Sequence, residues 1–370
     1  MSPATLGNGP PPIKVLPREY SDRRIVGSGY SDTFTWKMTM QIRNSCNAAD
    51  LSEFPAISEN PETAPTMTSD SNGTPIILAA SWTSLPSEFR RPGLSKHSLN
   101  QKRGKPLDSF LEGPIWVSDL DLLFVTDIPY GRIFSIDDNA QWSLVIEYDG
   151  EPNGLAWNHL TRKIVIADFK QGILELDPIT KELRTLAARY HGERFKGPND
   201  LVVRSDGSIF FTDQGMTGLH DPTGRVFRMD PDGRLELILS NGPSPNGLVL
   251  SHDESALFVA MTRDNAVWHV PFMRDGSVQR VGRFSSYYGI GGPDGMTQDS
   301  EGNILVAHSS LGTVFGHRGN GEMMKKIKSP EGVSTTNLTW GGPDLKTLYL
   351  VESGTGSILK IDWHCSGWLM

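Results

Sequence analysis

The sequence predicts an all-β fold, a six-bladed β-propeller, on three observations. A short motif that opens with a polar residue recurs six times, at spacings of 41 to 48 residues. Each copy is followed by a turn and by a short run rich in β-branched and aromatic residues. A second run of the same kind comes next in every repeat. A period in this range, carried by short strands, is typical of propeller blades.

The polar residue that opens each repeat is expected to begin the innermost strand of its blade. These six openers are Glu112, Asn153, Asn199, Asn246, Asp294 and Asn337. Their side chains would then meet at one mouth of the central channel. Taken one at a time, Asn-Gly and Asp-Gly are also common turn formers, so a simple turn stays open as an explanation for each. A glutamate at the same offset argues against turns as the shared cause, because glutamate is a poor turn former.

Two further strands follow each opener. The predicted second strands cover residues 122–126, 163–167, 208–212, 256–260, 303–307 and 347–351. The predicted third strands cover residues 132–137, 172–177, 225–230, 266–270, 312–317 and 357–362. A weaker fourth strand is expected to complete each blade, which gives six similar sheets.

The N-terminal part of the chain has a different composition. Residues 1–74 are rich in Pro, Ser, Thr, Asn and Gly, which predicts a disordered or loosely packed extension. The propeller domain is predicted over residues 75–370. Residues 75–85 are expected to close the ring as the outermost strand of the last blade, because an open blade would leave unpaired strand edges. Residues 86–108 carry six basic side chains and are expected to form a loop over one face.

Composition excludes several classes of partner. The formal net charge of −8 and the pI near 5.6 argue against nucleic acid, which needs clustered Lys and Arg. No apolar segment reaches the roughly 20 residues that cross a bilayer, and the N-terminus lacks a secretory signal. Only two cysteines are present, far apart in sequence, so no disulfide framework is predicted. We expect a cytoplasmic protein without a membrane partner, a monomer or a weak homo-oligomer.

The openers together have the chemistry of a cation site. Two carboxylates among amide oxygens, with no imidazole or thiolate, favour a hard cation, and Ca²⁺ over Mg²⁺. The second strands end in polar residues that are expected to rim the same pocket: Asp127, Asp168, Asp213, His308 and Glu352. Of these, only His308 has an unperturbed pKa suited to proton transfer near neutrality. A structural histidine is the alternative at that position.

Taken together, the motifs resemble the SMP-30/gluconolactonase (regucalcin) family over roughly residues 80–363. The segments that carry the resemblance are Glu112-Gly113-Pro114-Ile115-Trp116, Asn153-Gly154-Leu155-Ala156-Trp157, Gly197-Pro198-Asn199-Asp200, Pro245-Asn246-Gly247-Leu248 and Pro293-Asp294-Gly295-Met296. Gly197 stands where the animal branch has an arginine that contacts sugar hydroxyls, so the chain is closer to the microbial branch. A lactone smaller or more apolar than a sugar lactone is therefore open.

The resemblance implies a six-bladed propeller with one divalent metal, commonly Ca²⁺, with Zn²⁺, Mn²⁺ and Mg²⁺ as other candidates. It implies a small-molecule lactone, a sugar lactone or related cyclic ester, as substrate. The implied metal ligands are Glu112, Asn199, Asn246 and Asp294. Asn199 is also an implied substrate contact, and we expect the neighbouring opener Asn153 to be another. Asp294 is the implied general base, with His308 or Asp213 in that role if both Asp294 oxygens bind metal.

The leading hypothesis is hydrolysis of a lactone, with the metal as Lewis acid and a carboxylate that activates water. No Gly-x-Ser-x-Gly motif is present, so a serine hydrolase would lack its nucleophile. Two alternatives stay open. One is a non-hydrolytic propeller enzyme of secondary metabolism, since a fold does not fix its chemistry. The other is a calcium-binding or interaction propeller without turnover.

Overall fold

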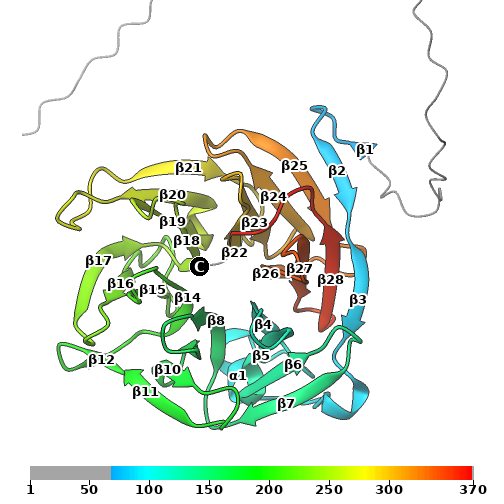
Figure 1. Ribbon diagram of the computed structural model, residues 1–370, viewed down its shortest axis with the longest axis horizontal. Helices are drawn as coiled ribbons and strands as arrows, with labels where there is room; N and C mark the ends of the chain where they lie inside the picture. Colours follow the sequence, from blue (N-terminus) through cyan, green and yellow to red (C-terminus); the bar gives the residue numbers. More distant parts are fainter. Residues whose placement is uncertain (1–67, 369–370) are drawn as a thin grey trace, which may run out of the picture. The chain divides into compact units, whose positions relative to one another are not determined.

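Six sheets, each built on four antiparallel strands, radiate from a central channel in the computed structural model, which describes residues 68–368 (Figure 1). The prediction of a six-bladed β-propeller is confirmed. The predicted extension, residues 1–74, lies outside the described residues except for 68–74. Among the described residues, no helix combines the length and apolar character needed to span a bilayer.

Each blade has four main strands, numbered from the channel outward. The innermost strands are β4 (Leu111–Val117), β8 (Pro152–Asn158), β14 (Pro198–Val203), β18 (Pro245–Leu250), β22 (Pro293–Gln298) and β26 (Thr335–Gly341). The second strands are β5 (Leu122–Asp127), β9 (Lys163–Asp168), β15 (Ile209–Asp213), β19 (Ala256–Met261), β23 (Ile304–His308) and β27 (Thr347–Glu352). The third strands are β6 (Arg132–Ile136), β10 (Gly172–Leu176), β16 (Gly224–Met229), β20 (Ala266–Pro271), β24 (Thr313–His317) and β28 (Ser357–Asp362). The predicted second and third strands agree with these bounds to within a residue or two.

The outer strands are more exposed, which explains their weaker sequence pattern. They are β7 (Trp142–Glu147), β11 (Leu183–Ala187), β17 (Leu235–Gly242), β21 (Gly282–Ser286), β25 (Met323–Lys328) and β3 (Ala80–Ser84). The remaining elements are β1 (Thr68–Ser69), β2 (Pro75–Leu78), the hairpin of β12 (Arg189–Tyr190) and β13 (Glu193–Arg194), α1 (Lys96–Gln101), and the 3₁₀ turns η1 (Ser87–Phe89), η2 (Ile128–Tyr130) and η3 (Thr262–Asp264).

Apolar side chains hold each blade to the next. The inward-facing residues of neighbouring sheets form six buried clusters, one between each adjacent pair of blades. In the cluster between the last and first blades, the ring of Trp116 on β4 stacks on Tyr349 of β27, with centroids 6.1 Å apart. Burial of this kind contributes about 25 cal/mol per Å² of apolar surface, so the interfaces between blades dominate stability.

The ring closes in the last blade through residues from the start of the domain. Strand β3 pairs antiparallel with β28, with Ser81 opposite Leu359, so the predicted ring closure is confirmed. The predicted strand over residues 75–85 is divided, however. Strand β2 runs parallel to β25 in the preceding blade, with Ile77 opposite Ile327. It thereby covers a strand edge that would otherwise stay unpaired.

A single ion pair ties the start of the described chain to this edge. The Asp70 carboxylate accepts a hydrogen bond from Lys326 Nζ on β25 at 2.6 Å. This bond, with backbone N–H groups of Thr74 and Asn72, lowers the pKa of Asp70 to about 2. A lowered carboxyl pKa stabilises the folded state above the unfolded pKa, 3.8, and this contribution disappears as the pH falls from about 4 to about 2.

We therefore expect Asp70→Asn to loosen β1 and β2 near neutral pH and to change little at pH 2. Hydrogen exchange of the Ile76 to Leu78 amides, measured at both pH values, tests this expectation. Asp275→Asn, in an exposed turn, is the matched control. Equal protection of wild type and Asp70→Asn at pH 7 would contradict the expectation.

Candidate metal centre

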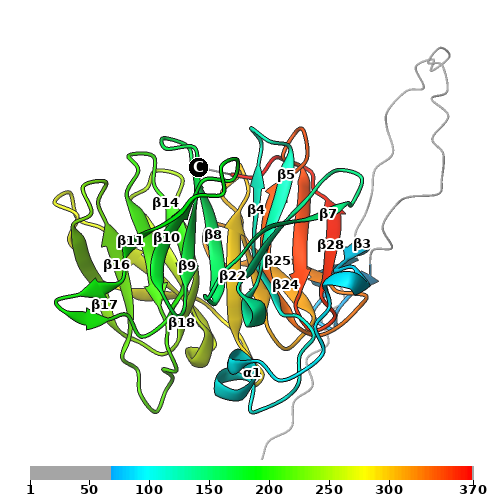
Figure 2. The same cartoon turned by 90° about the horizontal axis from the view of Figure 1, so that it is seen from below.

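Five of the six openers line one cavity at a mouth of the channel. The cavity has a volume of about 890 Å³, and its wall includes Glu112, Asn153, Asn199, Asn246 and Asp294. Helix α1 lies at this end of the ring, and the chain reaches the opposite end at its last described residues (Figure 2). The predicted convergence of these five side chains is therefore observed.

The sixth opener was assigned to the wrong residue. In the third blade, the residue before the opener, Pro198 on β14, pairs with Asp213 at the end of the second strand. In the last blade, Thr335 on β26 makes the equivalent pair with Glu352. The residue that occupies the opener position in the last blade is therefore Thr336. Thr336 lines the cavity, and Asn337 does not. The misassignment arose because the last blade has Thr-Thr where the others have a proline or leucine before the opener.

One residue deeper, two polar side chains meet across the channel. Asn337 donates from Nδ2 to Asp200 Oδ2 at 3.3 Å, and the two come from opposite blades of the ring. Glycines in the adjacent blades leave the space for them. A Cβ on Gly154 would stand 2.2 Å from Asp200 Oδ1, and one on Gly295 would stand 2.1 Å from Asn337 Oδ1. Gly154 and Gly295 thus lie within strands and serve this packing, which rules out turns as the reason for their motifs.

The carboxylates of the cavity are buried and close enough to repel one another. Burial raises the pKa of Glu112, although hydrogen bonds such as that from the Gly113 N–H act to lower it. Burial also raises the pKa of Asp294 well above its usual value, and the charge of Glu112 adds to this rise. Within residues 68–368, neither carboxylate makes an ion pair. Two buried acids that share a cavity without an ion-pair partner among residues 68–368 have the electrostatics that favour a bound cation.

Burial raises the pKa of Asp200 to about 7, and Glu112 contributes to this rise. The Leu201 N–H and Asn337 act in the opposite direction. Sequence reasoning missed Asp200 as part of the site. The signal was a polar residue at the offset where four other blades carry glycine.

The amide ligands include one that the fold orients. Asn199 donates from Nδ2 to Gln214 Oε1 at 2.9 Å, and Gln214 in turn donates to Ser244 Oγ at 3.0 Å. With its NH₂ group engaged, the carbonyl oxygen of Asn199 is available to a cation. Gln214 was not anticipated, because nothing in the repeat pattern marks the residue after a second strand.

The acidic residues at the ends of second strands do not rim the cavity. Each accepts a hydrogen bond from the backbone N–H at the approach to its own inner strand. The pairs are Asp127 with Phe110, Asp168 with Glu151, Asp213 with Gly197, and Glu352 with Ser334, at 2.7 to 2.9 Å. None of these acids is among the cavity-lining residues. They hold the inner strands in place. This structural role could not be predicted from their position at the ends of strands.

Asp213 and His308 were predicted as alternative bases, and the geometry supports neither. Both oxygens of Asp213 are engaged, one by the Gly197 N–H and the other by Arg225. His308 is fully buried among aromatic rings, including Tyr287 and Phe315, and burial lowers the pKa of its imidazole. Neither residue lines the cavity, so their catalytic roles stay predictions.

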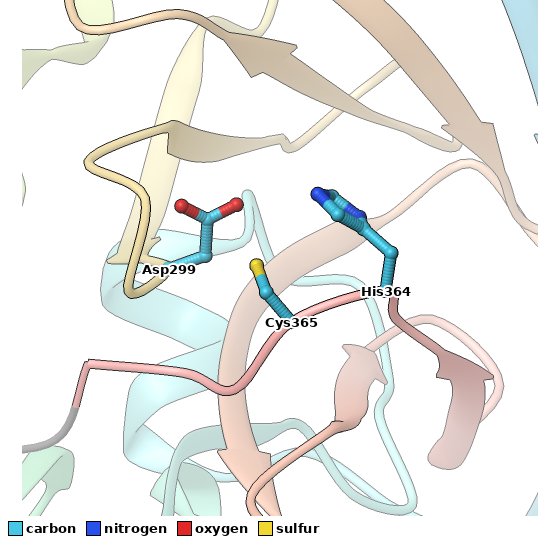
Figure 3. A group of neighbouring side chains, drawn as sticks. All are labelled: Asp299, His364 and Cys365. Atoms are coloured by element: carbon cyan, nitrogen blue, oxygen red, sulfur yellow. The ribbon is translucent and has the colours of Figure 1, made fainter.

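A second group of metal-ligand types lies near the C-terminus (Figure 3). Ligand atoms of Asp299, His364 and Cys365 are all within 4.8 Å of one another. The Asp299 carboxylate already accepts bonds from the side chains of Asn303 and Trp363, at 2.9 and 3.0 Å, and from backbone N–H groups. Burial raises the pKa of the Cys365 thiol, which favours its neutral form. A metal would have to displace these hydrogen bonds. We therefore assign this group a structural role, in which it holds the C-terminal segment against the last blades.

The fold and the channel mouth define a class: six-bladed propellers with carboxylate and amide oxygens gathered at one end of the channel. The SMP-30/gluconolactonase/LRE-like region matches residues 110–354. The chain belongs to this family, as its motifs indicated.

Named relatives agree with this membership. The chain is 30% identical over 273 residues to a gluconolactonase of Zymomonas mobilis, covering 65% of this chain and 76% of that protein. It is 27% identical over 256 residues to pentonolactonase XacC of Haloferax volcanii, covering 66% and 81%. The crystal structure of a calcium-binding regucalcin from Agrobacterium tumefaciens has a TM-score of 0.63 at 19% identity, with coverage of 80% and 97%. The structural likeness concerns the fold.

Proposed function

We propose that this protein is a metal-dependent lactonase, a hydrolase that opens a cyclic ester to a hydroxy acid. The observation that carries the proposal is the meeting of Glu112, Asn199, Asn246 and Asp294 at one cavity, with two carboxylates buried and unpaired. Relatives with lactonase names supply the reaction class. Ca²⁺ is the metal that best fits these oxygen donors.

The site residues have separate roles in the proposed reaction. Glu112, Asn199, Asn246 and Asp294 would hold the cation, and Gln214 keeps the Asn199 oxygen turned toward it. A bound divalent cation polarises the lactone carbonyl and stabilises the charge that develops on its oxygen.

Asp294 is the proposed base. One oxygen of its buried carboxylate would hold the cation, and the other would take a proton from the attacking water. The water oxygen bonds to the carbonyl carbon, the ring C–O bond breaks, and the proton passes to the departing alkoxide. Asn153, also in the cavity wall, would contact the ring substituents.

Removal of the metal is expected to abolish activity and to lower stability. The purified protein would be treated with chelator and assayed by proton release across a lactone panel, before and after addition of Ca²⁺. At 100 times the dissociation constant, a bound cation stabilises the fold by about 2.7 kcal/mol, so the melting temperature should rise by roughly 5–10 °C. Lactone hydrolysis at an unchanged rate in metal-free protein would contradict the proposal. Parallel additions of Mg²⁺, Mn²⁺ and Zn²⁺ rank the candidate metals.

A further inference from the structure

The segment at the mouth of the cavity, which includes α1, is held in place by hydrogen bonds and by burial. The Ser95 hydroxyl caps α1 by accepting a bond from the Ser98 N–H at 3.0 Å. Ser98 is fully buried, and Gln101 Nε2 donates to Glu151 Oε2 at 2.9 Å, next to the second blade. Residues 86–108, expected as a basic loop over one face, thus include a short helix fixed at the cavity.

This segment brings to the cavity wall polar groups that have no partner among residues 68–368. His97 is only 3% exposed, and neither ring nitrogen has a hydrogen-bond partner within residues 68–368. Its Nδ1 lies 3.6 Å from Glu151 Oε2, which is too long for a hydrogen bond. A buried imidazole without a partner in the wall of a cavity indicates a polar ligand.

Lys102, directly after α1, supplies a positive charge at the same place. Its Nζ lies 3.5 Å from the centroid of the Phe110 ring, and both residues line the cavity. Lys102 makes no ion pair within the described part of the chain. Burial lowers the pKa of its ammonium group, while Asp294 and Glu112 act to raise it. An ammonium group held in this way can receive an anion.

The charges of the cavity wall favour an anionic ligand once a cation is bound. A divalent cation would offset the two charges of Glu112 and Asp294. Lys102 and Arg263 would then remain as the positive groups of the wall, with Arg263 held by Nη1 to Ile290 O at 2.9 Å. A neutral lactone would leave Lys102 without a partner, whereas a carboxylate on the lactone would pair with it.

We propose that Lys102 is a specificity residue that selects lactones bearing a carboxylate substituent. The proposal rests on the proposed lactonase function and adds the chemical class of substrate. The carboxylate would bind at the cap formed by residues 96–102, and the lactone carbonyl would face the openers on the channel wall.

The test uses an isosteric pair: 5-oxotetrahydrofuran-2-carboxylate and its carboxamide. With Ca²⁺ present, we expect wild type to hydrolyse the carboxylate with a kcat/KM about 10- to 100-fold above that for the carboxamide. Lys102→Met should abolish this preference by slowing only the carboxylate, and Lys102→Arg should retain it. Lys105→Met, which removes an exposed charge outside the cavity wall, is the control and should keep the preference.

A second readout separates this inference from the function on which it rests. Binding of cyclopentanecarboxylate and cyclopentanecarboxamide, which cannot be hydrolysed, is measured by calorimetry. Tighter binding of the carboxylate to wild type, lost in Lys102→Met, supports the anion site even if no lactone is turned over, an outcome that would reject the lactonase. Turnover of lactones with equal preference in wild type and Lys102→Met overturns the role of Lys102 and leaves the lactonase standing.

Discussion

Replacement of Glu112 by Gln or of Asp294 by Asn is expected to lower kcat/KM for lactone hydrolysis by about 1,000-fold or more. Each change removes an anionic donor while it preserves side-chain shape, and metal stabilisation of the developing oxyanion contributes several kcal/mol. Both variants should also lose the rise in melting temperature on addition of Ca²⁺.

The metal-free variants should be at least as stable as the metal-free wild type. Burial is the main cause of the raised pKa of Asp294, and repulsion by Glu112 is the second. Removal of either acid relieves that repulsion. The expected signature is therefore lost activity with an intact fold, monitored by circular dichroism and thermal melting. Asp119→Asn serves as control, because Asp119 lies at the opposite mouth and pairs with Arg162 on the surface, where such pairs contribute little. Full activity in either Glu112→Gln or Asp294→Asn would reject this metal centre.

Removal of residues 1–90 is expected to destabilise the propeller severely, whereas removal of residues 1–70 should leave its melting temperature nearly unchanged. The longer deletion takes away β3, the outer strand of the last blade, and with it Leu85, which is 1% exposed, and Trp82, whose ring lies 4.9 Å from Tyr349. Loss of large core side chains costs about 2–5 kcal/mol each, so the melting temperature should fall by about 10 °C or more.

Removal of residues 1–78 separates the two strands that this segment contributes. It deletes β2 from the edge of β25 but keeps β3 in place, and we expect a melting temperature between the other two. Equal melting temperatures for the 1–70 and 1–90 deletions would show that the last blade does not need its borrowed strand.

The fold was predictable because the sequence pattern that specifies a blade repeats along the chain. Each blade must bury both faces against its neighbours, so the same alternation of strand and turn recurs along the chain. The division of residues 75–85 between two blades was not predictable. Residues 77 and 79 are apolar, and such residues pack equally well against either sheet; the choice depends on which edge is free in three dimensions.

Residues of the site were predictable from the sequence only where they occupy a fixed position in the repeat. Asn153 and Asn246 could be located by their offset, whereas Thr336 could not, because its blade departs from the motif. Gln214 and Lys102 lie in connections between strands, whose paths depend on side-chain contacts rather than on a period. Those contacts bring Lys102 to the cavity from a segment that precedes the first blade.

The hydrogen bond between Asp200 and Asn337 lies between the two cavities of the channel. Asp200 and Asn337, joined at 3.3 Å, line the second cavity and not the one beside α1. A ligand bound at the openers would therefore exchange with solvent on the side of α1, past Lys102.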